Sequence, residues 1–436
     1  MMDVIKDKLY PAFLLSKGIS TDTRNIAEGN LFFALKGPNF NGNEFAEKAI
    51  KAGASWAVLD EKQVHISDQK KVIYVVSVPK ALQQLSTFHR SQLKAKLIAI
   101  TGSNGKTTTK ELLYHILKSY DKNTFCTKGN LNNHIGVPLT LLSIPMSAKY
   151  AIVEMGSNQP GDIVELCEIT HPDVGLITNI GKTHLEKLKT QQGVFKEKSS
   201  LYRNILKHNG TFFLNKGDSF LLNLESKITI GYSSNHTQKT QIITDPNKLA
   251  LTFTLVNDNQ TKKVHTKLFG KYNIENIAAA LAISEFYNVP MNISTQAIEN
   301  YIPSNMRSQI IHTEQNTIVL DAYNSNPHSL NESLGHFTEA DVGRKIAILG
   351  DMLELGQSSK DEHQKVIKWA NYLGDITFMF VGMEFYENFV SSTNCQFFKT
   401  TEDCLKQIKK VPIINSNILL KGSRGIALEK LLPHLE

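Results

Sequence analysis

Cysteine is scarce in this sequence: its 436 residues include four cysteines, and no two of them form a C-x-x-C pair. Their wide spacing does not match any usual pattern of zinc ligands. We therefore expect reduced, part-buried thiols, as in a protein of the cytoplasm. Long apolar runs are also absent, so no window reaches the length of a membrane span or resembles a signal peptide. We expect a cytoplasmic protein without a membrane span.

No block of lysines and arginines stands out, although basic residues outnumber acidic ones by 48 to 41 and give a formal net charge of +7. Without such a block, or aromatic residues interleaved with it, the sequence does not predict nucleic-acid binding. The modest basic excess suits either an anionic small substrate or an ordinary mixed surface. The chain is long enough for two or three domains, each with a core of its own.

Residues 97–118 carry the strongest motif of the sequence, LIAITGSNGKTTTKELLYHILK. An apolar run over 97–100 predicts a buried strand, and the apolar residues after Thr107 follow helical spacing. The loop between them ends in Gly-Lys-Thr-Thr, as phosphate-binding loops do, although Ile100 replaces the usual first glycine. An ordinary glycine turn would not require this combination. The motif predicts nucleotide-phosphate binding by Gly102, Ser103, Asn104, Gly105, Lys106, Thr107 and Thr108.

The residues ahead of that loop form a separate small α/β unit in this interpretation. We predict strands at 31–35, 56–59 and 72–76 and a helix over about 43–52. Near its start the unit contains Asp22 and Arg24. The sequence supports two interpretations of this pair equally: a surface ion pair, which stabilises little, or a contact to a ligand.

Polar residues gather where the central strands end. Glu154 directly follows the apolar strand 151–153, and His184 comes shortly after a strand predicted over 174–178. A solvated glutamate and a structural histidine are the alternatives, but the strand-end positions favour contact with Mg²⁺ or phosphate. Asparagine-rich loops are usually turns. Here the loop enters a helix predicted to open near Pro138, at the same edge, which favours ligand binding by Asn130, Asn132 and Asn133.

The rest of the central segment is less specific. Residues 193–206 predict a helix with Lys196 and Lys198, and composition does not distinguish solvated lysines from functional ones. Residues 211–269 turn β-rich. An alanine-rich helix follows through residue 285, and the polar cluster at its start, which includes Asn276, is also what a helix cap requires.

The last segment alternates strands and helices, which predicts a parallel, Rossmann-like sheet. The predicted strands lie at 317–320, 345–349, 376–381 and 418–421. Asp321 and Asp351 follow two of them, and the stretch with Arg307 and Gln309 is interpreted as a linker. We predict an α/β protein of three domains: a small α/β domain (1–93), a central phosphate-loop domain with a parallel sheet and additional strands (94–304), and a C-terminal Rossmann-like domain (305–436).

Several stretches together resemble the Mur ligase family over nearly the whole chain. They are TGSNGKTTTKE at 101–111, TKGNLNNHIGVPLTLL at 127–142, VEMGSNQPGDI at 153–163, NIGKTHLE at 179–186, NIENIAAAL at 273–281, DAYNSNPHSL at 321–330 and ILGDMLELG at 348–356. The last two are the most specific. The N-terminal TDTRNIAEGNLFFALKG is similar to the UDP-binding domain of this family.

The resemblance implies an activity: the ATP-dependent addition of D-alanyl-D-alanine to UDP-N-acetylmuramoyl-tripeptide, through an acyl phosphate, in peptidoglycan precursor synthesis. The first domain would bind the UDP substrate and the third the amino acceptor, in a monomer. Two alternatives are the sister ligase MurE, expected to show D-N-P-R where this chain has DAYNSNP, and a folylpolyglutamate synthase-type ligase, which normally lacks such a UDP-binding domain. Outside the ligases, the alternative is an ATP-dependent switch that binds partners.

The resemblance also implies roles for single residues. Lys106 would contact the transferred phosphate, and two Mg²⁺ ions would be held by Thr107, Glu154, His184 and a carbamylated Lys198. ATP would also contact Asn276, Arg307 and Asp321. Substrate contacts are implied for Asp22, Arg24, Asn130, Asn132, Asn133, Tyr323 and Asn326. One departure is Met306, because many members have Gly-Arg where this chain has Met306-Arg307.

Overall fold

The computed structural model describes residues 2–62, 65–245, 247–258 and 260–436, which divide into two compact units. Unit 1 comprises Met1–Ala99, Asn123–Ser157 and Gly161–Val174. Unit 2 comprises Ile100–Lys122, Asn158–Pro160 and Gly175–Glu436. The domain boundaries expected near residues 93 and 304 stay predictions.

Unit 1 contains a four-stranded parallel sheet in the order β1 (Ile19–Ser20), β2 (Leu31–Phe33), β5 (Trp56–Leu59) and β6 (Val72–Tyr74). Alternate residues of β2 enter different cores, as the period of a strand requires. Leu31 and Phe33 pack with helix α4 (Val78–Gln92), whereas Phe32 packs with α3 (Ala46–Lys51). The predicted strands are confirmed. The helix expected over 43–52 begins as the 3₁₀ turn η3 (Gly42–Phe45).

The remaining elements of unit 1 place two polar stretches at strand ends. Strands β8 (Thr124–Cys126) and β9 (Tyr150–Glu154) pair in parallel, and Glu154 is the last residue of β9. Helix α6 (Gly136–Leu142) begins two residues before the expected start, so Pro138 is its third residue; α7 (Asp162–Thr170) follows β9. The N-terminal segment is helical over α1 (Met2–Val4), η1 (Ile5–Leu9) and α2 (Tyr10–Leu15).

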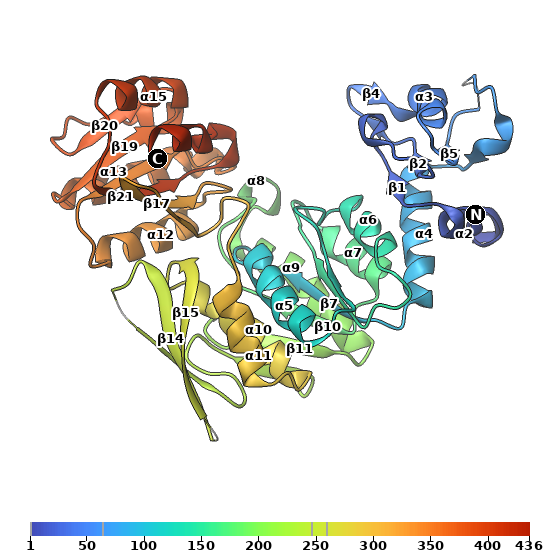
Figure 1. Cartoon of the computed structure of the whole chain (residues 1–436), viewed down its shortest axis with the longest axis horizontal. Helices are drawn as coiled ribbons and strands as arrows, with labels where there is room; N and C mark the ends of the chain where they lie inside the picture. Colours follow the sequence, from blue (N-terminus) through green and yellow to red (C-terminus); the bar gives the residue numbers. More distant parts are fainter. Residues whose placement is uncertain (1, 63–64, 246, 259) are drawn as a thin grey trace. The chain divides into compact units, whose positions relative to one another are not determined.

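The phosphate-loop motif folds as predicted. Strand β7 (Lys96–Thr101) is followed by the glycine loop and by helix α5 (Lys106–Tyr120), whose apolar face is buried. In unit 2, α5 packs against α10 (Asn273–Phe286) and α11 (Met291–Asn300) (Figure 1). The same unit contains β11 (Thr211–Asn215), β12 (Thr229–Tyr232), α8 (Leu185–Leu188), α9 (Gln191–Lys207) and β10 (Val174–Ile177) from its second residue onward.

A nine-stranded sheet forms the rest of unit 2. Its order is β13 (Gln241–Thr244), β14 (Ala250–Asn257), β15 (Gln260–Phe269), β16 (Gln309–His312), β17 (Asn316–Asp321), β21 (Ser416–Lys421), β18 (Lys345–Gly350), β19 (Ile376–Val381) and β20 (Cys395–Phe398). The strands from β17 to β20 are parallel, as predicted, whereas β13 to β17 pair antiparallel. Gln309 was expected in a linker, and this was wrong: it begins β16, which covers the edge of β17.

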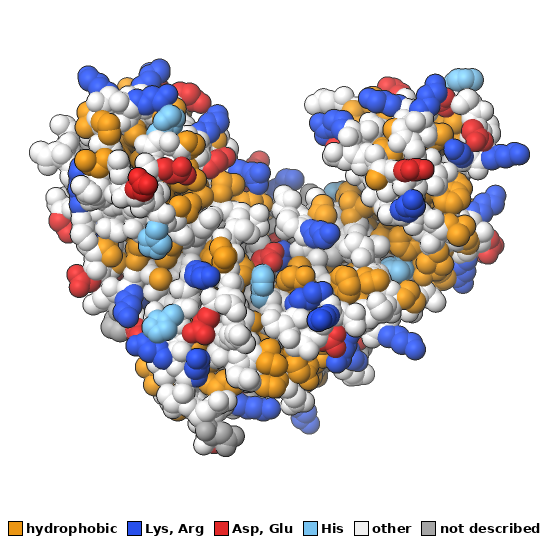
Figure 2. Space-filling view, in the orientation of Figure 1, with side chains coloured by type: hydrophobic (Ala, Val, Ile, Leu, Met, Phe, Trp, Pro, Cys, Tyr) orange, Lys and Arg blue, Asp and Glu red, His pale blue; other side chains and the backbone are white. Residues whose placement is uncertain are grey.

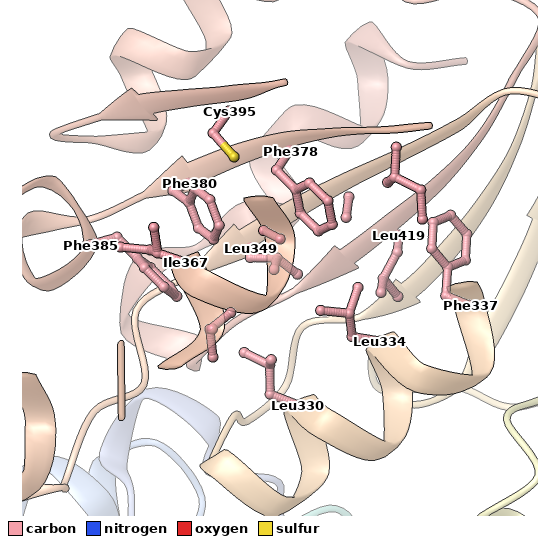
Figure 3. Close-up of a cluster of buried hydrophobic side chains, with 14 of the residues drawn as sticks. Leu330, Leu334, Phe337, Leu349, Ile367, Phe378, Phe380, Phe385, Cys395 and Leu419 are labelled. Atoms are coloured by element: carbon pink, nitrogen blue, oxygen red, sulfur yellow. The ribbon is translucent and has the colours of Figure 1, made fainter. Parts of the chain in front are cut away.

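Two apolar cores cover opposite faces of the parallel strands. Leu349, Phe378 and Leu419 pack with helices α12 (Pro327–Glu339) and α13 (Ser359–Tyr372), as Figure 3 shows. The neighbouring residues on the same strands enter the other core, with α15 (Thr401–Lys410). The short loops at the carboxyl ends of these strands are therefore attached to a sheet that is packed on both faces.

Among the described residues, no helix is long and apolar enough to cross a membrane. On the face drawn in Figure 2, basic and acidic side chains are interspersed.

Candidate functional site

Two glycines shape the loop between β7 and α5. Gly102 has φ +145° and Gly105 has φ +80°, both in the region that favours glycine. A Cβ atom on Gly102 would lie 1.8 Å from the Thr178 hydroxyl, and one on Gly105 would lie 2.2 Å from the Asn276 side-chain oxygen. The loop therefore needs glycine at both positions, for backbone conformation and for close approach.

Lys106 lies across this loop at the start of α5. Its Nζ donates to the carbonyl oxygens of Gly102, at 2.6 Å, and Ser103, at 3.0 Å. Thr107 and Thr108 follow in the first turn and are buried. An ammonium group beside the amino end of a helix is an arrangement that suits phosphate.

The loop after β10 supports the middle of the phosphate loop. The Asn179 side-chain oxygen accepts from the Asn104 backbone N–H at 3.0 Å, and the Thr178 hydroxyl donates to the Asn104 carbonyl at 2.5 Å. The Ser103 hydroxyl accepts from the Gly181 N–H at 2.8 Å. Thr178 and Asn179 were not predicted as site residues, although Asn179 begins the quoted stretch NIGKTHLE.

Asn326 connects the loop after β17 to the phosphate loop. Its Nδ2 donates to Oδ1 of Asn104 at 2.8 Å, while its own Oδ1 caps helix α12 at Ser329. Nδ2 of Asn104 is buried and has no hydrogen-bond partner among the described residues. The structure thus brings together two residues that were predicted to bind different ligands.

A chain of polar contacts runs from α5 to the nine-stranded sheet. Asn276 accepts from the Thr109 hydroxyl at 3.0 Å and donates to Asn273 at 2.8 Å. Asn273 donates to the Ser308 hydroxyl at 2.9 Å, and the Ser308 N–H donates to Asp321 at 3.0 Å. Lys421 then pairs with Asp321 at 2.8 Å. Asn276 and Asp321, both predicted nucleotide contacts, are therefore structurally linked and largely buried.

Arg307 stacks on Tyr323. The centre of its guanidinium lies 3.8 Å from the ring centroid, and Arg424, which was not predicted, lies 5.3 Å from the same ring. The departure at Met306 has a structural consequence, because Met306 has φ +55°, a conformation that glycine adopts without strain. Ser308 on the other side of Arg307 has φ +48°.

His184 interacts with a residue that the sequence interpretation missed. Its Nδ1 lies 3.1 Å from Oε2 of Glu354, and this hydrogen bond lowers the pKa of the Glu354 carboxyl. Both residues have positive φ, +52° and +66°. Glu354 lies within the quoted stretch ILGDMLELG, which was the available signal.

The other predicted metal ligands are oxygen donors and one lysine. Thr107 and Lys198 lie in unit 2, where Lys198 is 1% exposed on α9, and Glu154 lies in unit 1. Hydroxyl and carboxylate oxygens suit Mg²⁺. Among the described residues, no group of three or more His, Cys, Asp or Glu side chains could hold a metal ion. The complete ligand set stays a prediction.

The asparagine-rich loop of unit 1 contacts Glu154. Asn132 donates from Nδ2 to Oε1 of Glu154 at 2.8 Å. Oδ1 of Asn133 accepts from the N–H groups of Ile135 and Gly136 at the start of α6, and Asn130 is exposed. The structure therefore joins Asn132 to Glu154, whereas the Asn133 side chain is used at the helix start.

Asp22 and Arg24 pair with each other. Arg24 Nη2 lies 2.7 Å from Oδ2 of Asp22, and the Arg24 side chain is 84% exposed. Hydrogen bonds from the Arg24 side chain and backbone lower the pKa of Asp22 to about 2. The ion pair is confirmed, and the proposed ligand contact stays a prediction.

A cavity of about 490 Å³ adjoins the loop after β10. Burial raises the pKa of Glu275 in its wall, and the Asp218 carboxylate accepts from the Ile180 N–H at 2.7 Å. Asp218 thereby fixes the loop that supports Ser103 and Asn104. The cavity is lined by Asn179, Ile180, Gly181, Lys182, Gln191, Gly217, Asp218, Glu275, Pro327, His328, Asn331, Glu362 and Lys365.

Family models match three consecutive parts of the chain. Residues 16–90 match "Mur ligase family, catalytic domain", residues 100–284 match "Mur ligase middle domain", and residues 306–424 match "Mur ligase, glutamate ligase domain". Together they cover both the phosphate loop and the loops after β17 and β21.

Curated relatives match over nearly the whole chain. The UDP-N-acetylmuramoyl-tripeptide–D-alanyl-D-alanine ligases of Rickettsia prowazekii and Escherichia coli are each 31% identical to the chain, covering 96% and 100% of it and 95% and 97% of the relatives. The ligase of the same name from Buchnera aphidicola subsp. Baizongia pistaciae is 36% identical, with coverage of 96% and 92%. A crystal structure of MurF from Acinetobacter baumannii is 28% identical, with a TM-score of 0.85 and coverage of 98% of both chains.

Proposed function

Because this chain belongs to the Mur ligase family, we propose that it joins D-alanyl-D-alanine to UDP-N-acetylmuramoyl-tripeptide while ATP is converted to ADP and phosphate. Relatives named for this activity align with 96–100% of the chain. The observation that carries the proposal is the contact between Asn326 and Asn104. It joins the motif after β17 to the phosphate loop, as a reaction between an activated acid and an amine requires.

In the first step, the terminal carboxylate of the tripeptide attacks the γ-phosphorus of ATP. The bond from that phosphorus to the bridging oxygen breaks, ADP leaves, and an acyl phosphate forms. The ammonium of Lys106, held over the loop by the carbonyls of Gly102 and Ser103, neutralises charge on the transferred group. Activation is needed because a free carboxylate is a poor acyl donor.

In the second step, the amine of D-alanyl-D-alanine attacks the acyl carbon and forms a tetrahedral intermediate. The carbon–oxygen bond to phosphate then breaks, the nitrogen loses a proton, and an amide remains. Orientation supplies much of the rate acceleration in such a reaction, because the acyl phosphate and the amine must meet in one geometry. The rigid contacts of Asn104 with Asn179 and Asn326 serve that purpose.

We propose that Thr107, Glu154, His184 and a carbamylated Lys198 hold Mg²⁺, which when bound would offset phosphate charge. In this arrangement Glu354 would orient His184 through Nδ1, and Nε2 would be the nitrogen that holds the ion. We expect Lys198→Ala to lose most turnover. Normal turnover by that variant would exclude the carbamate role.

We also propose three domains with limits at residues 1–93, 94–304 and 305–436, and activity in the cytoplasm. The family-model matches 16–90, 100–284 and 306–424 fall within these limits and support the division. Separate expression of residues 1–93 would test the first boundary. We expect a folded fragment that binds UDP-N-acetylmuramoyl-tripeptide, and a fragment that cannot fold would contradict the boundary.

A phosphate-release assay tests the function. We expect release from ATP only when both UDP-N-acetylmuramoyl-tripeptide and D-alanyl-D-alanine are present, with a product whose mass equals the two minus water. ATP turnover that is indifferent to both would favour a nucleotide-dependent switch. Turnover with the dipeptide replaced by a single amino acid would favour a sister ligase.

A further inference from the structure

A fully buried histidine contacts both ends of the loop that carries Glu354. His363 lies in the second turn of α13, and its side chain has no exposed surface. Its Nε2 accepts from the Met352 N–H at 3.0 Å, and its Nδ1 lies 2.7 Å from the Ser359 carbonyl oxygen. Because an N–H group only donates and a carbonyl only accepts, the ring is neutral and carries its proton on Nδ1. One imidazole therefore joins the two ends of the loop 352–359.

Glu354 has an exposed side chain in a loop that is otherwise anchored. Met352 and Leu355 are buried in the core that includes α13, whereas the Glu354 side chain is 61% exposed. The Leu353 N–H donates to the Ser423 hydroxyl at 2.9 Å. Glu354 has φ +66°, a conformation that is unfavourable for a residue with a Cβ. Such a conformation persists only where the surrounding contacts hold the backbone, so Glu354 depends on the anchors of its loop.

Asp351 fixes the position from which this loop starts. Its two carboxylate oxygens accept from the N–H groups of Glu384 and Phe385, each at 3.0 Å, at the start of α14 (Met383–Glu387). Oδ1 of Asp351 lies 3.8 Å from Nε2 of His363, which is too long for a hydrogen bond. Asp351 therefore ties the end of β18 to α14, and the imidazole is left to hold the next residue of the loop.

The position of Glu354 matters because its carboxylate contacts His184. Oε2 of Glu354 lies 3.1 Å from Nδ1 of His184. A carboxylate bound to one ring nitrogen of a histidine fixes its tautomer and orientation, and this tunes the other nitrogen as a metal ligand. Any change in the backbone of the loop 352–359 would move the carboxylate away from that nitrogen.

We propose that His363 is a positioning residue, whose neutral ring holds both ends of the loop 352–359 so that Glu354 meets His184. This inference rests on the proposed function, in which His184 holds Mg²⁺, and extends it to a residue with no exposed surface. The alternative is a histidine that only stabilises α13. The two roles differ in what they predict for the loop and for His184.

The first measurement is hydrogen–deuterium exchange of the full chain without added metal, followed by mass spectrometry. In His363→Leu the amides of residues 352–358 should exchange about tenfold faster, because the Met352 N–H loses its acceptor. His363→Gln, which has one acceptor and a donor group, should recover most of the protection. His336→Leu is the matched control, since His336 is also buried and its Nε2 lies 3.2 Å from the Leu249 carbonyl oxygen. It should leave exchange of residues 352–358 unchanged.

The second measurement is the Mg²⁺ concentration for half-maximal phosphate release. His363→Leu should raise it by about three- to tenfold, less than removal of the carboxylate that contacts His184. In the Glu354→Gln background the same substitution should add less than about twofold, because the ring acts through Glu354. His336→Leu should leave the Mg²⁺ titration unchanged, even at an equal loss of melting temperature.

Unchanged exchange of residues 352–358 in His363→Leu, or equal Mg²⁺ shifts with and without Glu354, would overturn the assignment. If His363→Leu does not fold, His363→Asn and His363→Gln make the comparison, because asparagine is one methylene too short to reach both ends of the loop. Equal results for these two variants would also overturn it. If the unchanged protein released no phosphate with both substrates, the proposed function would fail, and the exchange data would still decide whether His363 holds the loop.

Discussion

At the scale of single residues, glycine conformation determines where the phosphate loop can run. Gly105 and Gly161 both precede a helix with positive φ, +80° and +97°. They differ in their surroundings, because a Cβ on Gly105 would meet the Asn276 side chain, whereas one on Gly161 would meet nothing within 4 Å. Alanine substitutions at these two glycines therefore separate the effect of backbone strain from the effect of close packing.

We expect Gly105→Ala to lower kcat/KM for ATP by about tenfold or more, because strain of about 1–2 kcal/mol adds to displacement of Asn276. Gly161→Ala should introduce similar backbone strain but leave kcat/KM for ATP unchanged. The measurement is phosphate release against ATP concentration for both variants. Equal effects in the two would mean that the contact with Asn276 has no role.

Glu354→Gln tests the orientation of His184. Loss of the carboxylate should raise the Mg²⁺ concentration for half-maximal activity by roughly 10- to 100-fold, as is usual when the partner of a metal-binding histidine is removed. Glu402→Gln is the control, since Glu402 forms an exposed ion pair with Lys430 at 3.4 Å. An unchanged Mg²⁺ titration for Glu354→Gln would mean that the contact between Glu354 and His184 has no role in metal binding.

The pair of Glu354 and His184 also predicts how the stability of the protein changes with pH. The hydrogen bond to His184 lowers the folded-state pKa of Glu354, so its contribution to stability is present above the ordinary glutamate pKa. That contribution is lost as the pH falls through the lowered pKa. As the pH is lowered, the melting temperature should therefore fall less steeply in Glu354→Gln than in the unchanged protein. Parallel curves would contradict this expectation.

At the scale of elements, helix α10 connects the phosphate-loop helix to the nine-stranded sheet. Asn276 contacts α5, and Asn273, one turn earlier, holds Ser308 and the Phe269 carbonyl. Polar groups buried this deeply are stabilising only while every partner is present.

Asn273→Ala should therefore destabilise unit 2. Removing the side chain takes the Asn273 donor from the Phe269 carbonyl and the Asn273 acceptor from Nδ2 of Asn276, at a cost of about 1–3 kcal/mol. Asn292→Ala, at an exposed position on α11, should change stability by less than about 0.5 kcal/mol. Urea unfolding of the two variants provides the comparison, and similar midpoints would contradict the proposed link.

Most elements could be predicted because their signals are local. The strand at 96–101 and the helix after it follow from apolar periodicity and the glycine loop. Strand β16 was missed, although it pairs with the next strand β17, because its four residues are only partly buried or exposed and so give a weak pattern. Its pairing with β15, between Leu268 and Gln309, joins segments that are remote in the sequence. The joining of antiparallel and parallel strands in one sheet was missed for the same reason.

The candidate site likewise contains residues that a local motif predicts and residues that only the fold brings together. The phosphate loop was predicted from one continuous motif. Asn276 lies close to Gly105 of that loop, while its contact with the nucleotide stays a prediction. Glu354 and Arg424 were missed because their partners, His184 and Tyr323, are remote in the sequence. An exposed charge has no periodicity, so only the fold reveals what it faces.

At the scale of the whole molecule, the proposed reaction gives different roles to successive parts of the chain. In that proposal the phosphate loop would activate an acid, and the C-terminal domain would receive the amine. Family models match three successive parts of the chain, residues 16–90, 100–284 and 306–424. Activation through an acyl phosphate is the central claim, because every other role depends on it.

Oxygen-18 in the terminal carboxyl group of UDP-N-acetylmuramoyl-tripeptide tests this claim most directly. After turnover with ATP and D-alanyl-D-alanine, mass spectrometry of the released phosphate should find one labelled oxygen per molecule, since the carboxylate oxygen that attacks phosphorus leaves with it. Released phosphate without label, from a reaction that still forms the amide, would contradict the account.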